Sequence, residues 1–365
     1  MVQQNNNAML QHLRLRMSKI NENILQELNK FIQTSNEIGE VKEKLGLPYF
    51  DPVRESQMLQ EVQNKNKGPL PTDLAKKIFN EIFKTSVELM GAEGKKKLQV
   101  QRGVSSESRV INLHNGARIG GHGKTLIAGP CAVENQEQME QTGLMLRKHG
   151  VKILRGGAFK PRTSPYSFQG LELEGLKLMR EVADQHNMAV ITEIMSIQDI
   201  EPVSQLADIL QVGTRNMFNY NLLKELGKVE KPIFLKRGFM ATIEEFILAA
   251  EYIHLAGNTE IILCERGIRT FETQTRNTLD ISAVPILKKE TTLPVIVDIS
   301  HALGRKDILV PIAKASLAAG ADGLMVEAHY NPAVAWSDSA QQLGPLEAEE
   351  FFKALDMGVF DLNTS

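Results

Sequence analysis

The chain has 365 residues, of which 42% are hydrophobic and 24% are charged, and it carries a net charge of −2. This composition is typical of globular proteins and excludes the disordered, collagen-like and fibrous classes. A nearly neutral chain has no overall field that would hold a polyanion, so we expect neither a nucleic acid nor a membrane as a partner. The length suits two or three domains of about 150 residues each.

We expect no targeting segment in this sequence. Its first residues, MVQQNNNAMLQHLRLRM, lack the apolar core of a signal peptide, and no run reaches the length of a membrane span. We therefore expect a cytoplasmic protein. The cysteines, Cys131 and Cys264, are too few for a disulfide framework, so each is interpreted as a buried thiol or a site residue.

Residues 1–92 have the pattern of a small all-helical domain. The polar run at residues 3–7 is interpreted as a frayed terminus. Over residues 10–31, apolar side chains recur every three or four positions, which predicts one long amphipathic helix. Gly39 and Gly46 are expected to close this region.

Two more helices are predicted before the linker. Asp51 followed by Pro52 is typical of a helix start and predicts a second helix that ends near Asn66. A third periodic stretch covers residues 74–89. Residues 93–108 are interpreted as the linker to the next domain, because they are charged and lack periodicity.

Residues 109–365 show short apolar runs that alternate with helical periodicity. A hairpin-like segment with an Asn115-Gly116 turn comes first. The apolar runs that follow are TLIAGPC, KILRGG, AVITEI, ILQVG, PIFLKRG, EIILCERG, PVIVDIS and GLMVEA. The clearest helical segments between them are residues 134–149, 171–187, 243–256 and 309–319.

Eight strand-helix units in about 240 residues predict an α/β fold, namely a (β/α)8 TIM barrel preceded by the small all-α domain. The alternative is an open, doubly wound sheet. It is disfavoured because no glycine-rich dinucleotide motif follows the first apolar run.

Most of the predicted strands end in a charged, thiol or imidazole residue. In chain order these residues are Cys131, Arg155, Arg215, Lys236, Arg266, His301 and Glu327. The C-terminal ends of barrel strands form the active site of this fold, so we expect these side chains to converge on one opening. Random surface charge would not follow that register.

The strand-end residues form two chemical groups. Cys131, His301 and Glu327, with Asp338 just beyond the last run, offer sulfur, nitrogen and carboxylate donors. Such a mixture suits a divalent transition ion better than magnesium, which prefers oxygen alone. The cationic group consists of Arg155, Lys160, Arg162, Arg215, Lys236 and Arg266. Clustered cations need anions, which points to phosphorylated and carboxylated small molecules.

Each residue also has a simpler interpretation. Taken alone, Cys131 is a buried small side chain and His301 a hydrogen-bonded structural residue. Asp338 lies within Ser337-Asp338-Ser339 and would be a helix cap, and the cations would be surface charges. Cys264 keeps the interpretation of a buried thiol.

The motifs GPCAVE, ILRGGAFKPRTSP, LKRG, ILCERGIRT, DISH and AWSDSAQQ resemble those of the type Iβ group of 3-deoxy-D-arabino-heptulosonate 7-phosphate (DAHP) synthases. The resemblance extends from about residue 109 to residue 355. It implies condensation of phosphoenolpyruvate with erythrose 4-phosphate, the first step of the shikimate pathway. In that reaction the enol carbon attacks the aldehyde, water adds to the resulting cation-like centre, and phosphate leaves.

The resemblance also implies roles for individual residues. One divalent ion of the Mn, Fe, Co or Zn class would be bound by Cys131, His301, Glu327 and Asp338 and polarise the aldehyde. Phosphoenolpyruvate would be bound by Arg155, Lys160, Arg215, Lys236 and Arg266. The phosphate of erythrose 4-phosphate would be bound by Arg162, Thr163 and Ser164. Lys160 would protonate the aldehyde oxygen. The predicted catalytic residues are therefore Lys160 and, as ligands of the ion that polarises the aldehyde, Cys131 and His301.

Two alternatives to this activity remain. The first is 3-deoxy-D-manno-octulosonate 8-phosphate synthase, which uses arabinose 5-phosphate. Members of that family have an Asn-containing loop where this chain reads KPRTS, so the shorter sugar is favoured here. The second is a barrel that binds ligands as a regulatory module without catalysis, for which the sequence offers no support.

The N-terminal helices resemble a chorismate mutase of the AroQ class. The polar residues at that family's pocket positions are Arg14, Lys42, Asp51, Arg54, Glu55 and Ser86. The chain departs from the family at Phe31, where a carboxylate-binding Arg is usual, and at Met90, where a Gln is usual. Loss of a charged hydrogen bond of about 1.5–3 kcal/mol lowers affinity roughly tenfold or more.

We hold two hypotheses for this domain. It is either an impaired mutase, which would make the chain bifunctional, or a regulatory and assembly module that no longer isomerises chorismate. We favour the second. The resemblance implies feedback inhibition by chorismate or prephenate, and a homo-oligomer, a tetramer, with paired helical domains.

Overall fold

The computed structural model describes residues 2–93, 98–103, 107–160, 166 and 168–355. The chain divides into two compact units, a helical unit (Met1–Leu98) and a barrel unit (Gln99–Ser365). The division lies within the stretch interpreted from the sequence as a linker. The backbone N–H groups of Gln99 and Val100 donate to the buried Glu251 carboxylate at 3.0 and 3.1 Å, which fixes the start of the barrel unit.

The helical unit consists of α1 (Val2–Lys44), α2 (Pro52–Lys65) and α3 (Thr72–Glu93). The prediction for the first helix is wrong at its start, because α1 already includes the polar run at residues 3–7. Gln and Asn cost at most about 0.7 kcal/mol each in a helix, and cooperative growth of a long helix tolerates them. The helix also continues past Gly39 and ends before Gly46, whose φ of +67° is left-handed.

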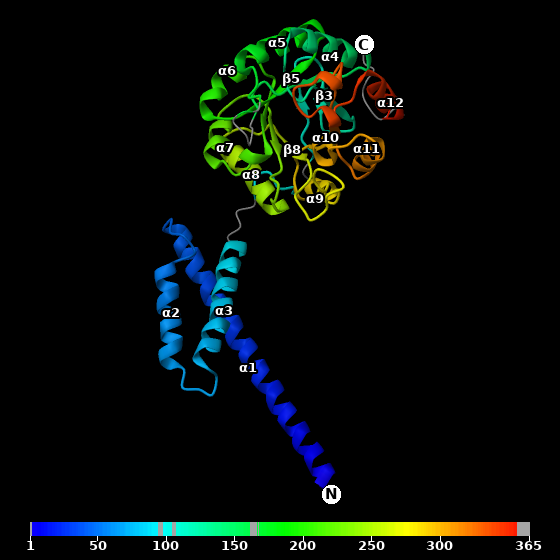
Figure 1. The fold of residues 1–365 in the computed structure, drawn as a ribbon. Coiled ribbons are helices and arrows are strands. Elements are labelled where there is room, and N and C mark those ends of the chain that lie inside the picture. Colours follow the sequence, from blue (N-terminus) through cyan, green and yellow to red (C-terminus); the bar gives the residue numbers. More distant parts are fainter. Residues whose placement is uncertain (1, 94–97, 104–106, 161–165, 167, 356–365) are drawn as a thin grey trace. The chain divides into compact units, whose positions relative to one another are not determined.

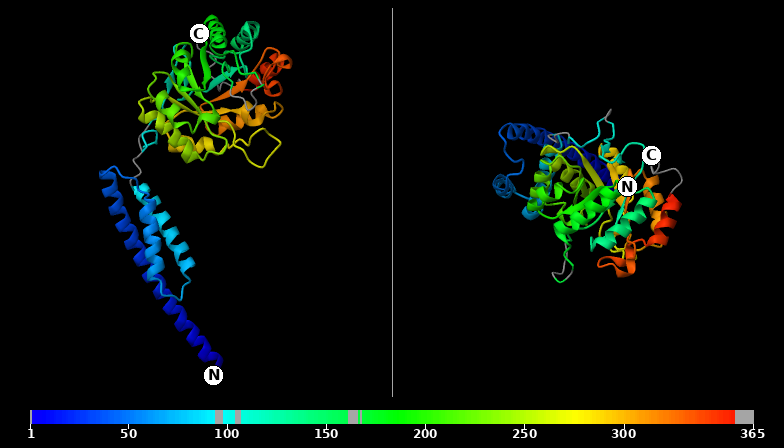
Figure 2. Two further views of the ribbon diagram at one scale, coloured as in Figure 1. Left: turned by 60° about the vertical axis from the view of Figure 1, so that its left-hand side comes forward. Right: turned by 90° about the horizontal axis from the view of Figure 1, so that it is seen from above.

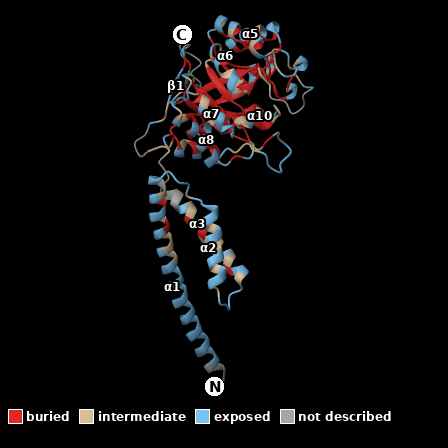
Figure 3. Cartoon of the chain, turned by 90° about the vertical axis from the view of Figure 1, so that its left-hand side faces the viewer, coloured by how far each residue is buried: buried red, intermediate tan, exposed pale blue. Residues whose placement is uncertain are grey.

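Packing of α1 on α3 explains why Gly39 does not end the helix. Ser35 and Gly39 are one turn apart and buried, so small side chains lie on the face that contacts α3. Phe31, one turn earlier, stacks on Phe83 of α3 with 5.9 Å between ring centroids. Much of the rest of α1 is exposed (Figure 3).

Helix α2 begins as predicted. The Asp51 carboxylate accepts hydrogen bonds from the backbone N–H groups of Val53 and Arg54 at 3.1 and 3.0 Å, which satisfies donors that the first helical turn leaves free. Asn66 forms the C-cap.

In the described part of the chain, eight parallel strands form a closed barrel in the order β10-β3-β4-β5-β6-β7-β8-β9. Figure 1 shows the barrel unit with β3, β5 and β8 labelled. Their bounds are β3 (Thr125–Gly129), β4 (Ile153–Arg155), β5 (Ala189–Ile194), β6 (Ile209–Val212), β7 (Ile233–Lys236), β8 (Ile261–Glu265), β9 (Val295–Asp298) and β10 (Gly323–Glu327). Each strand falls within one predicted apolar run, so the predicted TIM barrel is confirmed. The barrel closes where β10 pairs with β3, with Glu327 opposite Gly129.

Helices surround the strands (Figure 2). They are α4 (Gln136–Lys148), α5 (Glu172–Gln185), α6 (Ile200–Ser204), α7 (Tyr220–Leu226), α8 (Ile243–Leu255), α9 (Ala283–Glu290), α10 (Ile299–Leu303), α11 (Leu309–Ala318) and α12 (Pro345–Leu355). The helical segments predicted between the apolar runs correspond to α4, α5, α8 and α11. Within the described residues, none of the helices is both long and apolar enough to span a membrane.

A short hairpin covers the N-terminal ends of the strands. It pairs β1 (Ile111–Asn112) with β2 (Arg118–Ile119) in antiparallel fashion. The Asn115 side chain in its turn donates to the carbonyls of Lys152, one residue before β4, and Asn187, two residues before β5. The hairpin thus covers one end of the barrel, and the opposite, C-terminal end is left for the site.

Candidate active site

Side chains from the C-terminal ends of the barrel strands line one cavity of about 370 Å³. The predicted residues among its lining are Arg155, Lys160, Arg215, Lys236, Arg266, His301 and Asp338. Cys131 and Glu327 lie beside it and are fully buried. The structure therefore brings the described members of both predicted groups to one place.

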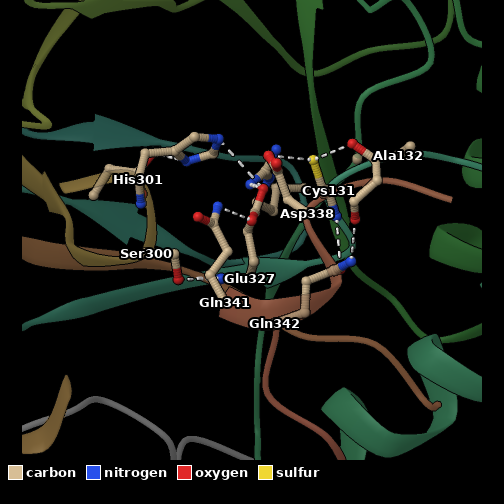
Figure 4. Close-up of polar contacts among 12 residues, drawn as sticks. Cys131, Ala132, Ser300, His301, Glu327, Asp338, Gln341 and Gln342 are labelled. Atoms are coloured by element: carbon tan, nitrogen blue, oxygen red, sulfur yellow. Dashed lines mark hydrogen bonds and ion pairs between the residues drawn. The ribbon is translucent and has the colours of Figure 1, made fainter. Parts of the chain in front are cut away.

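Cys131, Glu327 and Asp338 offer donor atoms within 4.8 Å of one another. His301 lies next to this group, with its Nε2 atom 3.4 Å from Glu327 Oε1. Figure 4 shows the side chains of Cys131, His301, Glu327 and Asp338 pointing towards one region. Thiolate, imidazole and carboxylate donors at such spacing fit a divalent first-row transition ion. We call Cys131, His301, Glu327 and Asp338 the donor set.

The buried Asp298 at the end of β9 orients His301. One carboxylate oxygen lies 2.8 Å from His301 Nδ1, and the other accepts the backbone N–H of His301 at 3.1 Å. Lys236 reaches the same carboxylate at 2.5 Å. Because Nδ1 is engaged in this way, Nε2 is the ring atom that faces Glu327 and is available to a metal.

Burial has different outcomes for the two innermost donors. It raises the pKa of the Cys131 thiol to about 12, and the charge of Glu327 adds to this effect. Burial alone would also raise the pKa of Glu327. The neighbouring positive charges outweigh it, including Arg155 at 2.6 Å, and the pKa is lowered to about 2. Glu327 is therefore anionic at neutral pH, whereas Cys131 keeps its proton until a cation displaces it.

The cationic side of the cavity has unsatisfied donors. Arg266 Nε and Nη1 and Arg155 Nε are buried, and no hydrogen-bond partner for them lies within the described residues. A buried guanidinium without partners is costly unless an anion binds to it. Lys236 and Arg215 line the same cavity. This arrangement suits a small ligand that carries several negative charges.

Lys160 lies between the donor set and the cations. Its Nζ atom donates to the Cys131 carbonyl at 2.8 Å and lies 3.0 Å from Cys131 Sγ. The predicted phosphate-binding residues Arg162, Thr163 and Ser164 lie outside the described residues.

The sequence analysis missed several residues that line or support the cavity. Glu193 on β5 is one of them, and burial raises the pKa of its carboxyl although Lys160 and Lys236 oppose this. A charge one position before the end of an apolar strand was the available signal. Phe239 and Arg276 also line the cavity, and Gln341 and Gln342 contact the donor set. They lie in loops or, for Gln341, in a single 3-10 turn (Ser339–Gln341), where no periodicity marks a position.

The pocket residues predicted in the helical unit have separate surroundings. Arg14 is exposed on α1, and Arg54 lies 3.8 Å from Glu61. Lys42 donates to the carbonyl of Tyr49. Of the others, Asp51 caps α2, Glu55 is half-buried on α2, and the buried Ser86 donates to the carbonyl of Phe83.

An apolar groove lies elsewhere in the helical unit, between α1 and α3. Its lining includes Ile24, Leu28, Phe31, Phe79 and Ile82. Phe31 therefore lies on an apolar surface at the position where a charged residue was expected from the resemblance. The Met90 side chain is outside the described part of the structure.

Comparison with known families agrees with both units. Residues 99–358 match the DAHP synthetase I family, and residues 13–91 match chorismate mutase type II. A phospho-2-dehydro-3-deoxyheptonate aldolase of Thermotoga maritima is 54% identical over 244 residues, which cover 67% of this chain and 72% of that protein. A 2-dehydro-3-deoxyphosphooctonate aldolase of Fusobacterium nucleatum is 29% identical and covers 62% and 87%.

Solved structures give the same result. The crystal structure of the DAHP synthase of Thermotoga maritima superimposes with a TM-score of 0.70 at 50% identity, covering 73% of this chain and 79% of that one. A truncated form of the Thermotoga maritima enzyme gives a TM-score of 0.66 at 47% identity, covering 72% and 97%. The chain belongs to the DAHP synthetase I family, as a transferase of the DAHP synthase type with a chorismate mutase type II domain ahead of its barrel.

Proposed function

We propose that the barrel condenses phosphoenolpyruvate with erythrose 4-phosphate to give DAHP and inorganic phosphate, with one divalent transition ion bound by the donor set. The observation that carries this proposal is that one cavity joins the donor set with buried guanidinium nitrogens of Arg155 and Arg266 that have no hydrogen-bond partner among the described residues. The ion would contact the aldehyde, and the cations would bind the phosphate and carboxylate of the enol substrate.

A divalent ion bound here supplies Lewis-acid polarisation of the aldehyde oxygen. Arg155 and Arg266 hold the anionic substrate through their free guanidinium nitrogens. Lys160, between the two groups, donates a proton to the aldehyde oxygen as the enol carbon bonds to the aldehyde carbon. Arg162, Thr163 and Ser164 are proposed to bind the phosphate of the sugar.

The second half of the reaction needs a base. Glu193 is the cavity carboxylate outside the donor set, and its raised pKa suits a group that accepts a proton from water. The water oxygen bonds to the phosphate-bearing carbon of the former enol. The bond from that carbon to the phosphate oxygen then breaks, and inorganic phosphate leaves.

The first experiment measures phosphate release from phosphoenolpyruvate by the purified full chain. Release is expected only when erythrose 4-phosphate is present, to disappear on chelation, and to return with manganese. If folded, metal-loaded protein released nothing, the catalytic proposal would fail and the barrel would be better explained as a ligand-binding module.

The same assay with arabinose 5-phosphate tests the alternative eight-carbon product. The relatives named for phosphooctonate chemistry are 27–29% identical to this chain, against 54% for the Thermotoga maritima protein, which favours the four-carbon sugar. Turnover of arabinose 5-phosphate at a higher kcat/KM than erythrose 4-phosphate would reverse this assignment.

We also propose that the helical unit is a regulatory module with little or no mutase activity. Support comes from Phe31, which stacks on Phe83 and lines an apolar groove where a carboxylate-binding Arg is usual in the resembled family. Chorismate or prephenate is the proposed ligand. Titration with each compound distinguishes the cases: binding without turnover supports regulation, and conversion of chorismate to prephenate would identify a bifunctional enzyme.

Assembly and location are further proposals. The exposed apolar side chains of α1 support pairing of helical units in a homotetramer; they include Leu10, Leu13, Met17, Ile20 and Ile24. Sedimentation equilibrium of the full chain checks the mass, and a monomer would reject the tetramer. A cytoplasmic location is checked by cell fractionation.

A further inference from the structure

The segment between β10 and α12 carries Asp338 and, three residues later, the adjacent Gln341 and Gln342. Gln341 and Gln342 are 4% and 0% exposed, so both side-chain amides are inside the protein. A buried amide needs partners for its N–H groups and its oxygen. The partners found here belong to the donor set or to its immediate neighbours (Figure 4).

Gln342 joins the segments that carry Cys131 and Asp338. Its Oε1 atom accepts the backbone N–H of Cys131 at 2.9 Å, and its Nε2 atom donates to the carbonyl of Ser337 at 2.8 Å. Ser337 directly precedes Asp338 and places its hydroxyl 3.2 Å from Cys131 Sγ. One amide therefore fixes the spacing between two donors that are 207 residues apart in the sequence.

Gln341 makes the corresponding connection to Glu327. Its Nε2 atom donates to Glu327 Oε2 at 2.5 Å, and its Oε1 atom accepts from Arg276 at 3.0 Å. Arg276 also contacts the Asp338 carboxylate at 3.2 Å. Glu327 Oε1 is engaged by Arg155, so both of its oxygens have a fixed direction.

The backbone at Asp338 shows why such contacts are needed. Its φ of +49° and ψ of 38° are left-handed, which residues other than glycine rarely adopt. Such a conformation persists only where the surroundings hold it. Gln342 holds the carbonyl of the preceding residue, Ser337, and Gln341 holds Arg276, which contacts the Asp338 carboxylate.

We propose that Gln341 and Gln342 are positioning residues of the metal centre, which hold Asp338 in register with Glu327 and Cys131 before any ion binds. This inference rests on the proposed function, because it takes the donor set to be a metal site. Partners that orient metal ligands typically change metal affinity about 10- to 100-fold when removed.

The test uses cobalt(II) alone as the probe, bound to the chelator-treated full chain. Gln342→Met and Gln341→Met keep the side-chain length and remove the hydrogen bonds. Gln205→Met, at an exposed position after α6, is the matched control. Each variant is measured for its cobalt dissociation constant, for the thiolate-to-cobalt absorption per bound ion, and for the melting temperature of the metal-free protein.

We expect both site variants to bind cobalt about 10- to 100-fold more weakly than the control variant. Gln342→Met should also lose thiolate-to-cobalt absorption, because Cys131 and Asp338 are no longer tied, whereas Gln341→Met should retain it. A merely structural role would lower the melting temperature and leave the cobalt constant of the folded protein within about twofold of wild type, which would overturn the inference.

Two further results are distinguishable. If the unaltered chain bound no cobalt, the metal site itself would be rejected, and the role of the glutamines with it. If the unaltered chain and both variants bound cobalt equally tightly, the metal site would stand and only the positioning role would be rejected. Should Gln342→Met fail to fold, Gln341→Met decides the question by its own dissociation constant.

Discussion

Cys131 and Glu327 lie within one donor set, yet their protonation at neutral pH differs. The thiol has a raised pKa of about 12, and the carboxyl a lowered pKa of about 2. Burial is the largest effect on both groups and raises both pKa values. At Glu327 the positive charges of His301 and Arg155 outweigh burial, whereas at Cys131 the charge of Glu327 adds to it. The site before metal binding is thus anionic at the carboxylate and neutral at the sulfur.

Metal binding should therefore release the Cys131 proton. Below pH 12 this proton must leave for the thiolate to bind, so we expect apparent manganese affinity to rise about tenfold per pH unit from about pH 7 to about pH 8. Competition against a chelator of known affinity measures this slope. Cys264→Ala, at the other buried cysteine, should keep the slope. A slope near zero would show that Cys131 is not a ligand.

Phe239 organises the cationic side of the cavity. Its ring has the guanidinium groups of Arg215, Arg266 and Arg269 at 5.7, 4.8 and 4.3 Å from the centroid. Each cation–π contact is worth about 0.5–2 kcal/mol, and the ring also keeps like charges at fixed positions. A neutral aromatic residue thus holds three guanidinium groups together.

Phe239→Leu should weaken phosphoenolpyruvate binding about 5- to 30-fold, which corresponds to a loss of about 1–2 kcal/mol. Isothermal titration of the metal-loaded chain with phosphoenolpyruvate measures the change. Phe271→Leu, at a position that is 97% exposed in the loop after β8, is the control and should bind as wild type does. Equal affinity in both variants would remove Phe239 from the binding site.

At the scale of elements, the strand ends explain how much of the fold and of the candidate site could be predicted from the sequence. Each apolar run became a strand, and residues at strand ends such as Arg155, Lys236 and Glu327 were found because a charge directly follows buried positions. Glu193 was missed because it lies one position before the end of its strand.

Loop residues could not be predicted in this way. Gln341 and Gln342 are uncharged and lie in a segment without periodicity, so their contacts depend on a fold that only the tertiary structure reveals. Likewise, the start of α1 was misplaced because a polar run is compatible with both a helix and a frayed terminus. Local patterns thus identify elements and their ends, whereas contacts between loops need the three-dimensional arrangement.

Gly213, directly after β6, tests the position of Glu193. Its φ of −69° and ψ of 158° suit any residue, but an added Cβ would collide with the Glu193 carboxylate. We expect Gly213→Ala to cost about 1–3 kcal/mol of stability and to lower kcat about 100-fold, through displacement of the base. Thermal melts and phosphate-release kinetics measure both effects.

The control for this prediction is Glu193→Gln, which removes the base without the collision. It should reproduce the loss of kcat but melt at the temperature of wild type. A lower melting temperature of Gly213→Ala is then due to the collision. Turnover of Glu193→Gln within about twofold of wild type would mean that the carboxylate at position 193 takes no part in the reaction.

On the scale of the whole molecule, the described donors and cations all come from the barrel unit. A chain of residues 99–365 should therefore turn over substrate at a rate of the same order as the full chain. It should also lose any response to chorismate or prephenate. Phosphate release by both chains, with and without these compounds, measures this. A folded barrel without activity would assign a catalytic contribution to the helical unit.

The closing of the barrel has a consequence for the order of events during synthesis. Cys131 follows the first barrel strand, Glu327 ends the last one, and β3 and β10 pair directly. The donor set therefore spans the seam of the barrel, and Asp338 lies beyond it. A nascent chain has no complete donor set until the ribosome has passed this residue, so an ion bound by the full set marks a finished and closed barrel.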